Sequence, residues 1–522
     1  MLSRIQSFVL TGIDAISCEI EIDVANRSMP STHIVGLPDA AVKEALDRVR
    51  AAIQNTGYSF PQGRVLINLA PADVRKEGPV YDLPIAVGVL IAEGVIEAGD
   101  RGAIDPRACV FAGELALDGR VRPIKGAISM ALLARQLGAR SIVVPHENAI
   151  EASVVEGLEV YGVRTLAEVV GLFNGAIPVE PMPAIDVGEL VESTPASIDF
   201  EEVKGQEGVK RAICVAASGS HNLLMIGPAG TGKSMMAKAL PGILPTLTPD
   251  EALEVTRIYS AAGLLDRASS STGLMTSRPV RTPHHTASTS AVIGGGQVPR
   301  PGEVTLAHKG VLFLDELPEF SRDVLETLRQ PLEDDVVTIA RAHSTVTFPA
   351  SLMLIAALNP TPKGATPTSI AGQREMERYL SRLSGPLVDR IDIHVEAPSV
   401  PWKQLRDTRV RGTSSAQMRE IVLHAREVQV ARQGAVTNAR LRTRDLDRLA
   451  PLDDGAEALL GQAISELGLS ARAYDKVRRV ARTIADIDGS GSICAAHVGE
   501  AVQYRLLDRP SWFGTPQMVG AR

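Results

Sequence analysis

The chain has 522 residues, a formal net charge of −7, 45% hydrophobic residues and 22% charged residues. Because single domains usually hold ~100–200 residues, this length predicts two or three domains, and the composition excludes wholesale disorder, collagen and coiled coil. Aromatic residues make up only 3% of the chain, which argues against proteins that read bases by aromatic stacking. Any nucleic acid would be bound mainly through its backbone charge.

Four cysteines, Cys18, Cys109, Cys214 and Cys494, are scattered without a close pair, so neither a disulfide framework nor a C-x-x-C metal site is predicted. The N-terminus lacks a basic segment followed by an apolar core. The longest apolar run, Leu83–Ala92, is far shorter than the ~20 residues that a membrane span needs. These features predict a soluble cytoplasmic protein that does not contact a membrane.

Residues 1–175 alternate strand and helix patterns, which predicts an α+β domain. The strands are expected at 17–24, 64–69, 108–112 and 141–144, and the helices at 40–54, 83–94 and 126–137. Residues 176–198 follow, with four prolines among acidic and small residues. That composition is typical of an extended linker.

A second α/β block is predicted over 199–401, with apolar strands at 223–226, 310–314 and 352–357. Nearly continuous apolar strands indicate a parallel sheet covered on both faces. The last segment, 402–522, is predicted as a helical bundle, with helices at 416–432, 444–449, 456–467, 471–487 and 495–507. It is net basic whereas the rest of the chain is net acidic, which suits either phosphate contact or a solvated helical surface. The fold class is therefore α/β.

A phosphate-binding loop follows the first strand of the second block and precedes a helix-prone segment. Its residues match G-x-x-x-x-G-K-[ST] and are Gly227, Pro228, Ala229, Gly230, Thr231, Gly232, Lys233 and Ser234. The glycines let backbone N–H groups surround phosphates, Lys233 adds positive charge, and the Ser234 hydroxyl is suited to bind Mg²⁺. The cofactors predicted are ATP and Mg²⁺.

Acidic and amide side chains end the next two predicted strands. Asp315 and Glu316 follow the strand 310–314, and Asn359 follows the strand 352–357. Because the carboxyl ends of parallel strands meet at one edge of a sheet, we expect Asp315 in the Mg²⁺ shell and Glu316 beside the attacking water. Asn359 orients that water only if its strand neighbours the one that ends at Asp315, and Asn-Pro is otherwise a frequent turn.

These motifs, with Leu380–Arg390 and the helix that opens at Leu469, resemble AAA+ ATPases of the magnesium-chelatase-like group, and most closely the YifB/ComM family, over essentially the whole chain. The resemblance implies that Arg390 reaches the γ-phosphate of a neighbouring subunit and that Arg472 is the sensor arginine of the helical lid. From the residues alone, the favoured interpretation of each is a surface or helix-capping arginine. Val203, Gly205 and Gln206 are similar to the AAA+ segment that packs on adenine.

Two segments are candidates for DNA contact. The family-like loop between the phosphate loop and Asp315 contributes Arg278, Arg281, His284 and His285, and its basic, hydroxyl-rich composition suits a polyanion. The adjacent histidines alternatively bind a metal, although no third ligand is in register. A predicted β-hairpin over 336–348 contributes Arg341 and His343, which an ordinary exposed turn would equally explain. Thr361–Gly364 replace the cysteine cluster of many relatives, so no zinc is expected.

The N-terminal domain resembles the proteolytic domain of Lon, which has the ribosomal protein S5 domain 2-like fold, over 76–80 and 111–148. A Ser-Lys protease needs a hydroxyl nucleophile and an amine of lowered pKa. Val80 and Ile128 occupy the two dyad positions, Lys125 lies three residues away, and Tyr81 is a poor substitute. We therefore predict a Lon-like fold without peptidase activity.

The leading functional prediction is a ring-forming, hexameric, ATP-dependent motor that acts on DNA. The family resemblance implies branch migration or helicase activity in recombination or natural transformation. Two alternatives stay open: a chelatase-like or protein-remodelling AAA+ motor, and an ATP-binding scaffold without motor activity. The paired carboxylates and arginines favour hydrolysis over mere binding.

Overall fold

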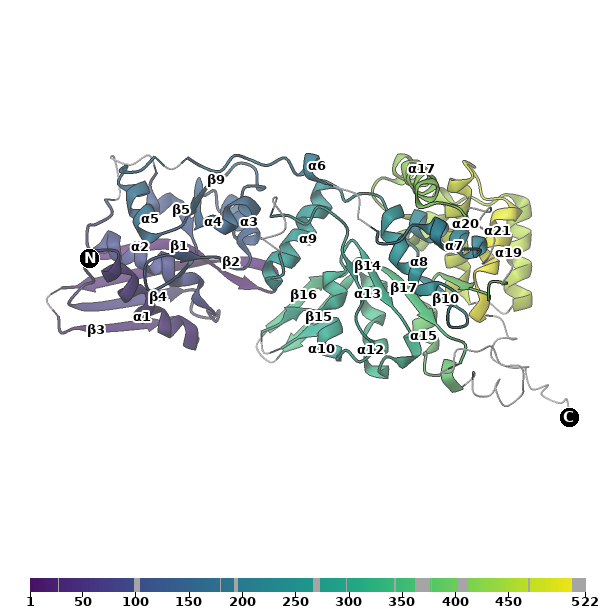
Figure 1. Ribbon diagram of the computed structural model, residues 1–522, viewed down its shortest axis with the longest axis horizontal. Coiled ribbons are helices and arrows are strands. Elements are labelled where there is room, and N and C mark those ends of the chain that lie inside the picture. Colours follow the sequence, from purple (N-terminus) through teal and green to yellow (C-terminus); the bar gives the residue numbers. More distant parts are fainter. Residues whose placement is uncertain are drawn as a thin grey trace. The chain divides into compact units, whose positions relative to one another are not determined.

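The computed structural model describes residues 1–26, 28–97, 104–178, 180–191, 196–265, 273–296, 298–341, 344–361, 376, 378–401, 412–467 and 470–508. The chain forms two compact units (Figure 1). Unit 1 comprises Met1–Val191 and Thr248–Thr276, and unit 2 comprises Glu192–Leu247 and Ser277–Arg522. Each unit contains its own hydrophobic core. No helix among the described residues is both long enough and apolar enough to span a membrane.

Unit 1 is built on a seven-stranded mixed sheet in the order β3-β4-β2-β1-β5-β8-β9. The β1–β2 and β2–β4 pairs are antiparallel, whereas the β3–β4, β1–β5, β5–β8 and β8–β9 pairs are parallel. The strands are β1 (Leu2–Thr11), β2 (Asp14–Ala25), β3 (Ser31–Val35), β4 (Arg64–Ala70), β5 (Cys109–Phe111), β8 (Ser141–Pro145) and β9 (Glu159–Val163), with a short β6–β7 hairpin (Glu114–Leu115, Val121–Arg122) beside them.

The helices of unit 1 are α1 (Ala40–Asn55), α2 (Asp82–Ala92), α3 (Ala127–Gln136), α4 (His146–Ala152), α5 (Leu166–Phe173), α6 (Val187–Leu190) and α9 (Pro249–Ala262). All four predicted strands and all three predicted helices of this region are present, so the α+β prediction is confirmed. The linker prediction missed α6, a single turn that Asp186 caps by accepting a hydrogen bond from the Gly188 N–H.

Helix α9 packs within unit 1, although its sequence lies inside the range predicted for the second block. Thr248 and Glu251 form a capping box, and Pro249 occupies the first turn, which together start the helix. Near the end of α9, Ser260 accepts a hydrogen bond from the Gly126 N–H at the start of α3. The phosphate loop and the strands that follow it belong to unit 2.

The core of unit 2 is a parallel five-stranded sheet in the order β11-β14-β17-β10-β18. Every residue of β10, β14 and β17 is buried, which confirms the prediction of a parallel sheet covered on both faces. The strands are β10 (Leu223–Ile226), β11 (Val280–Arg281), β14 (Val311–Leu314), β17 (Met353–Leu358) and β18 (Ile393–Glu396). The helices are α7 (Glu207–Gly219), α8 (Lys233–Ala239), α10 (Thr289–Ile293), α11 (Glu303–Leu306), α12 (Arg322–Thr327), α13 (Arg329–Asp334) and α15 (Gly385–Val388).

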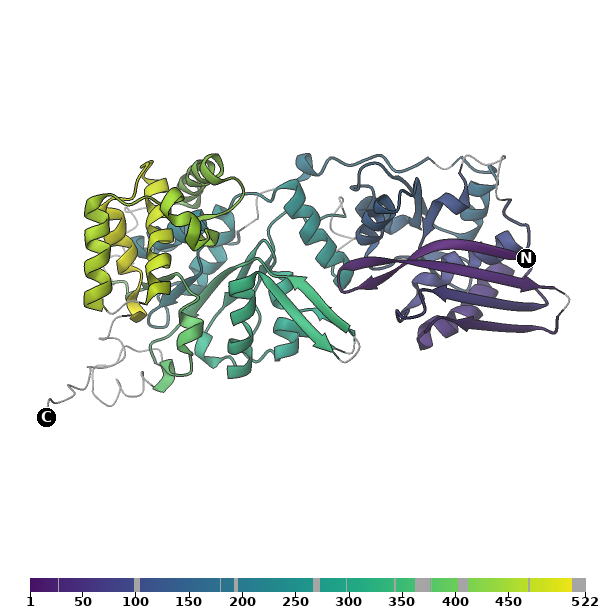
Figure 2. The same cartoon turned by 180° about the vertical axis from the view of Figure 1, so that it is seen from behind.

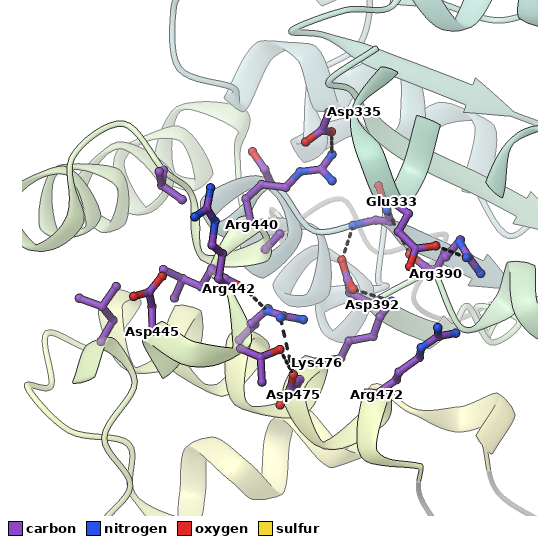
Figure 3. Close-up of a pocket in the computed structure, with 18 of the residues that line it drawn as sticks. Glu333, Asp335, Arg390, Asp392, Arg440, Arg442, Asp445, Arg472, Asp475 and Lys476 are labelled. Atoms are coloured by element: carbon purple, nitrogen blue, oxygen red, sulfur yellow. Dashed lines mark hydrogen bonds and ion pairs between the residues drawn. The ribbon is translucent and has the colours of Figure 1, made fainter. Parts of the chain in front are cut away.

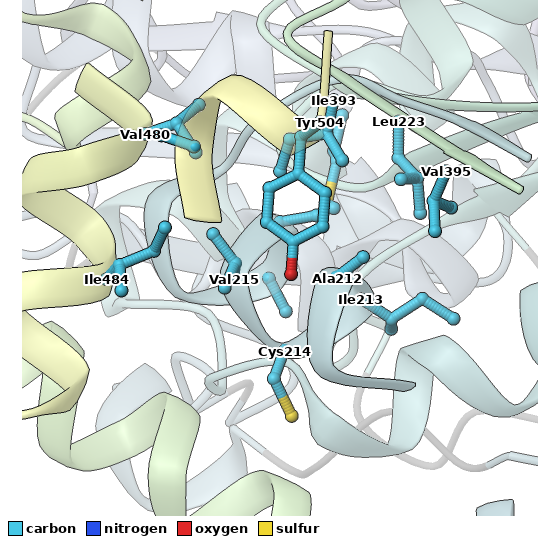
Figure 4. Packing of buried hydrophobic residues seen from close by; sticks show 14 of the residues in the cluster. Ala212, Ile213, Cys214, Val215, Leu223, Ile393, Val395, Val480, Ile484 and Tyr504 are labelled. Carbon is cyan, nitrogen blue, oxygen red and sulfur yellow. The ribbon is translucent and has the colours of Figure 1, made fainter. Parts of the chain in front are cut away.

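A helical region completes unit 2 and shares the core of the sheet. Its helices are α17 (Ser415–Gln433), α18 (Thr443–Leu449), α19 (Asp454–Leu467), α20 (Ala471–Ile487) and α21 (Ala495–Gln503), as the helical pattern predicts. Figure 4 shows how Val215 of α7 lies between Ile393 of β18 and Ile484 of α20 in one apolar cluster. Because this cluster is continuous, the sheet and the helical region pack as one body.

The predicted hairpin over 336–348 is confirmed. Strands β15 (Val336–Arg341) and β16 (Ser344–Pro349) pair antiparallel, with Val336 opposite Pro349 and Arg341 opposite Ser344. The hairpin follows α13 and extends away from the five-stranded sheet (Figure 2). A second, very short hairpin is formed by β12 (Gly294–Gly295) and β13 (Arg300–Pro301).

Candidate ATP site and the opposite edge of the sheet

The phosphate loop lies at the carboxyl end of β10, where the sequence places it. A side chain at Gly227 would lie 2.2 Å from the Ala397 carbonyl oxygen, so only glycine allows the loop to approach the end of β18. Gly230 and Gly232 have φ angles of 81° and 88°, a region that glycine adopts without strain. Helix α8 then starts at Lys233, and the first N–H groups of a helix have no partner within it. The loop is thus built to surround an anion.

Lys233 lies inside this loop and is only 7% exposed. Its ammonium group donates hydrogen bonds to the Gly227 carbonyl at 2.7 Å, the Pro228 carbonyl at 2.9 Å and Oδ1 of Asn359 at 3.1 Å. Burial lowers the pKa of Lys233, while the carboxylates of Asp315 and Glu316 act in the opposite direction. A buried cation without a directly bonded carboxylate favours an incoming phosphate.

Two oxygen groups suited to Mg²⁺ meet beside the phosphate loop. The Ser234 hydroxyl donates a 2.7 Å hydrogen bond to Oδ2 of Asp315, and Asp315 follows directly after β14. Hydroxyl and carboxylate oxygens are hard ligands of the kind that Mg²⁺ prefers. The residues therefore fit the ion that the motif implies.

Asn359 occupies the position that the prediction requires. Its strand, β17, lies between β10 and β14 in the sheet, so the ends of all three strands meet at one edge. The hydrogen bond from Lys233 places the Asn359 amide directly at the phosphate loop. Its assignment as a water-orienting residue stays a prediction.

The predicted adenine segment contacts the phosphate loop through Gln206. Gln206 donates hydrogen bonds to the Pro398 carbonyl at 2.6 Å and to the Thr231 carbonyl at 3.3 Å. Its Oε1 is buried and has no hydrogen-bond partner among the described residues, so it can accept one from a ligand. Val203 is buried, and one of its methyl groups would lie 3.5 Å from a Cβ atom placed on Gly232. Gly205 and Gln206 both adopt left-handed backbone conformations, with φ angles of 66° and 61°.

Arg390 lies at the edge of the sheet opposite the phosphate loop. Strands β10 and β18 are parallel, with Leu223 beside Ile393 and Ile226 beside Glu396. The phosphate loop follows the carboxyl end of β10, whereas Arg390 precedes the amino end of β18. Its guanidinium pairs with Glu333 and donates to the carbonyls of Arg329 and Pro386. Arg390 therefore does not belong to the phosphate site of its own chain.

Arg472 lies at the same edge as Arg390, and both line a pocket of about 1090 Å³ (Figure 3). Arg472 is exposed in the first turn of α20 and has no ion-pair or hydrogen-bond partner among the described residues. One turn later, Lys476 pairs with Asp392 at 2.9 Å, which attaches α20 to the start of β18. Basic side chains outnumber acidic ones along the pocket wall, so the pocket suits an anionic group.

The predicted DNA-contact loop divides into structural and exposed residues. Arg278 donates to the carbonyls of Pro245, Thr246 and Lys309, which engages its guanidinium within the fold. Arg281 pairs with both carboxylate oxygens of Glu303 at 2.6 and 2.8 Å. These contacts favour structural roles for both arginines, whereas His284 is exposed and His285 is half-buried.

Arg341 is exposed at the end of β15, whereas His343 lies outside the described residues. The metal alternative for His284 and His285 gains no support, because the described part of the chain holds no group of three or more His, Cys, Asp or Glu side chains that fits a metal ion. Most of the stretch that replaces the cysteine cluster, 362–364, is outside the described residues, so the expectation of no zinc stays a prediction.

The dyad positions of the Lon-like domain lie in well-packed surroundings. Val80 is half-buried in the turn before α2, and Ile128 is fully buried in α3. Tyr81 is also buried, and burial raises the pKa of its hydroxyl. A phenol with a raised pKa is a poor nucleophile at neutral pH, in line with its interpretation as an inadequate substitute.

Sequence reasoning did not single out Lys476 or Asp392, which hold α20 against the sheet. The sequence does place Lys476 on the same helix face as Arg472, because the two residues are four positions apart. Its partner Asp392 could not be assigned, because the contact depends on how α20 packs against β18. The contact between His285 and Glu316, at 3.6 Å, was likewise missed.

Comparisons with known proteins agree with this geometry. Family models match three segments: magnesium chelatase, subunit ChlI, over residues 199–405; subunit ChlI of Mg-chelatase over 20–148; and magnesium chelatase, subunit ChlI C-terminal, over 412–505. The fold and the site thus define an AAA+ ATPase of the magnesium-chelatase type, which implies hydrolysis of ATP with Mg²⁺.

Two of the relatives match nearly the whole chain. This chain is 42% identical over 517 residues to competence protein ComM of Haemophilus influenzae, and the match covers 97% of this chain and 98% of that protein. It is 41% identical over 517 residues to the uncharacterized protein YifB of Escherichia coli, with the same coverage of 97% and 98%. The chain belongs to the YifB/ComM family. Lon protease 2 of Bacillus subtilis is 26% identical over 181 residues, 32% of this chain and 31% of that protease, in agreement with a Lon-like N-terminal domain.

Proposed function

We propose that this chain assembles into a hexameric ring that hydrolyses ATP at its subunit interfaces and moves on DNA. Branch migration, a helicase-type activity in recombination or natural transformation, is the task that this motor performs. Three features support the proposal: the ATP site of unit 2, the position of Arg390 at the sheet edge away from that site, and the exposed basic loops.

One observation supports the ring most strongly. Lys233 and Arg390 lie at opposite edges of the same parallel sheet. An arginine is needed at the γ-phosphate because charge develops there during phosphoryl transfer, and such an arginine contributes ~10³-fold or more in rate. Since Arg390 is remote from its own phosphate loop, it acts on the nucleotide of the next subunit. Head-to-tail repetition of that contact closes a ring.

Within each interface, different residues bind the phosphates, hold Mg²⁺, position water and stabilise developing charge. Lys233 and the N–H groups at the start of α8 bind the phosphates, and Ser234 and Asp315 hold Mg²⁺. When held there, the ion would supply positive charge that offsets the negative charge of the phosphates. Glu316 polarises the attacking water, and Asn359 orients it. Arg390 and Arg472 of the neighbour stabilise the charge that develops, after Arg390 exchanges Glu333 for phosphate.

Contact with DNA is assigned to exposed groups of unit 2. Arg341 at the end of β15 and His284 in the loop after β11 are both exposed. A ring collects such side chains from every subunit around one channel, so the channel is basic although the chain has a net charge of −7. The name of the relative ComM as a competence protein agrees with a role in natural transformation.

The proposal is tested by ATP hydrolysis with and without forked DNA, together with DNA binding at several salt concentrations. We expect DNA to stimulate hydrolysis, and binding to weaken steeply as salt rises. Glu316→Gln is expected to abolish hydrolysis and to retain ATP binding. Absence of both DNA stimulation and salt-dependent binding overturns the proposal.

A second candidate is a chelatase-like or protein-remodelling motor, which the matches to magnesium chelatase subunit ChlI favour. That motor would use the same ATP site on a protein partner. It predicts hydrolysis that is indifferent to DNA, so the same assay separates the two functions. An ATP-binding scaffold without turnover is disfavoured by the complete set of Lys233, Asp315, Glu316 and Arg390.

A further inference from the structure

An ion pair joins the segment that carries Arg390 to the helix that carries Arg472. Nζ of Lys476 lies 2.9 Å from Oδ1 of Asp392, and the two side chains are only 13% and 14% exposed (Figure 3). Asp392 follows Arg390 by two residues, and Lys476 follows Arg472 by four. The two arginines assigned to the neighbouring nucleotide are therefore connected through a buried contact that lies beside them.

Asn222 fixes the segment of Arg390 and Asp392 against the start of β10. Its side-chain Nδ2 donates to the Arg390 carbonyl at 3.1 Å, and its backbone N–H donates to Oδ2 of Asp392 at 3.1 Å. The Asp392 N–H in turn donates to the Asn222 carbonyl at 3.0 Å. Oδ1 of Asn222 accepts from the Leu354 N–H at 2.9 Å, so the segment is tied to both β10 and β17. Asp392 is thus a rigid attachment point on the sheet.

Lys476 attaches the end of α20 on which Arg472 lies. Farther along this helix, Val477, Val480 and Ile484 are buried in the core of unit 2. Arg472 in the first turn is exposed, and residues four apart in a helix lie on one face with a rise of ~6 Å between them. Because Lys476 joins this face to the sheet one turn from Arg472, its ion pair sets how far Arg472 stands from the sheet edge.

The Lys476–Asp392 pair carries charge inside the fold. Burial opposes ionisation of Asp392, but the Lys476 ammonium beside it holds the pKa of that carboxyl below its ordinary value. A buried carboxylate that loses its counter-ion is strongly unfavourable, whereas a neutral pair of similar size leaves no unpaired charge. The geometry of the pair is therefore well defined, and a neutral replacement removes the attraction without stranding a charge.

We propose that Lys476 and Asp392 are positioning residues for the two arginines. Their ion pair sets the spacing between Arg390 and Arg472, so that both guanidinium groups reach one neighbouring nucleotide together. All four side chains line the same pocket. Charge develops on the γ-phosphoryl group during transfer, and a misplacement of ~1 Å can cost ~10²-fold in rate. This inference rests on the proposed function, because it needs a subunit interface.

The decisive variant is the neutral double change of Lys476→Met with Asp392→Asn. We expect kcat for ATP hydrolysis without DNA to fall about tenfold or more, since the arginines lose their relative positions. KM and the dissociation constant for a fluorescent ATP analogue should stay within about twofold, because the phosphate loop of the same chain is intact. An unchanged kcat, with the variant folded by circular dichroism, overturns the inference.

Two single variants control for the loss of charge and for general damage. Lys476→Arg keeps a cation opposite Asp392 and should recover most of the wild-type kcat. Arg444→Ala removes a 73% exposed arginine that pairs with Asp445, and it should hydrolyse ATP as the wild type does, because exposed ion pairs contribute little. A loss in Lys476→Arg as large as that in the double variant contradicts a role for the ion pair.

Mixed subunits decide on which side of the interface the defect of the double variant lies. Mixing it with Lys233→Ala should restore part of the hydrolysis, since the Lys233→Ala subunits supply intact arginines to its intact phosphate loop. Mixing it with Arg390→Ala should restore none, because both subunits then have defective arginines. The reverse pattern means that the pair supports the phosphate loop of its own chain and overturns the inference, as does recovery in both mixtures.

The mixture of Arg390→Ala with Lys233→Ala decides the proposed ring separately. Recovery there, without recovery when the double variant is mixed with Lys233→Ala, denies the positioning role alone. No recovery in any mixture denies action between subunits, and with it both proposals. Because every rate is measured without DNA, the positioning role is decided whether or not the protein moves on DNA.

Discussion

The ammonium group of Lys233 lies 3.1 Å from Oδ1 of Asn359. This hydrogen bond joins the phosphate loop after β10 to the end of the neighbouring strand β17, and thus joins the residue that binds phosphate to the one predicted to orient water. Lys233 also bonds two carbonyl oxygens of its own loop. Among the described residues, the hydrogen-bond partners of the Lys233 ammonium are neutral oxygens, and phosphate oxygens are stronger partners for a cation.

Replacing Lys233 by alanine is expected to weaken ATP binding by about tenfold or more, because a buried charge-assisted hydrogen bond is worth ~1.5–3 kcal/mol. Titration of the protein with a fluorescent ATP analogue measures the change. Lys238→Ala is the matched control, since Lys238 lies in the same helix and is exposed. If Lys233→Ala and Lys238→Ala bound the ATP analogue with equal affinity, Lys233 would not be a phosphate-binding residue.

Arg390→Ala is expected to abolish hydrolysis while ATP binding persists, because Arg390 lies at the opposite sheet edge from its own Lys233. Mixing Arg390→Ala subunits with Lys233→Ala subunits should restore part of the activity. Each mixed ring then contains interfaces with an intact Lys233 on one side and an intact Arg390 on the other. Steady-state hydrolysis of the mixture, compared with each variant alone, gives the result.

The control for this experiment is Arg382→Ala, which removes an arginine of the same region that is 54% exposed and pairs with Glu319. It should hydrolyse ATP nearly as the wild type does, because exposed ion pairs contribute little to stability. Failure of the mixture to regain activity, with both variants folded, means that Arg390 does not act between subunits.

The phosphate site could be predicted almost completely from sequence, because Lys233, Asp315 and Asn359 each follow an apolar strand and parallel strands end at a common edge. Contacts that loops and helices make across the fold could not be predicted from sequence. The pairs His285–Glu316 and Lys476–Asp392 depend on the path of a loop and on the packing of α20, which no local pattern encodes. Strand β1 was missed because it buries Ser3 and Ser7, which weakens its apolar alternation.

A buried charge cluster joins the helices of unit 2. Asp486 is fully buried and accepts hydrogen bonds from Arg482 at 3.0 Å and from Asn438 at 2.7 Å, and it also pairs with Arg432. Asp486→Ala leaves two arginines without their counter-ion and should lower the free energy of unfolding by about 3–5 kcal/mol. Urea denaturation followed by circular dichroism measures this. Asp488→Ala, whose side chain is 46% exposed, should change stability by far less.

The N-terminal domain is expected to show no peptidase activity, because Val80 and Ile128 provide neither a nucleophile nor a base. Incubation of the protein with fluorescent casein, with and without ATP, should release no fluorescence. Val80→Ser alone should also be inactive, since the lysine position stays an isoleucine. Cleavage by the wild-type protein that a serine-directed reagent blocks would contradict this prediction.

Movement on branched DNA driven by ATP hydrolysis is tested most directly with a labelled synthetic four-strand junction. Native gel electrophoresis follows the conversion of the junction to duplex products with ATP and Mg²⁺. We predict conversion by the wild-type protein and none by Glu316→Gln, although both bind the junction. A wild-type protein that hydrolyses ATP in the presence of the junction and yet leaves it intact would contradict branch migration.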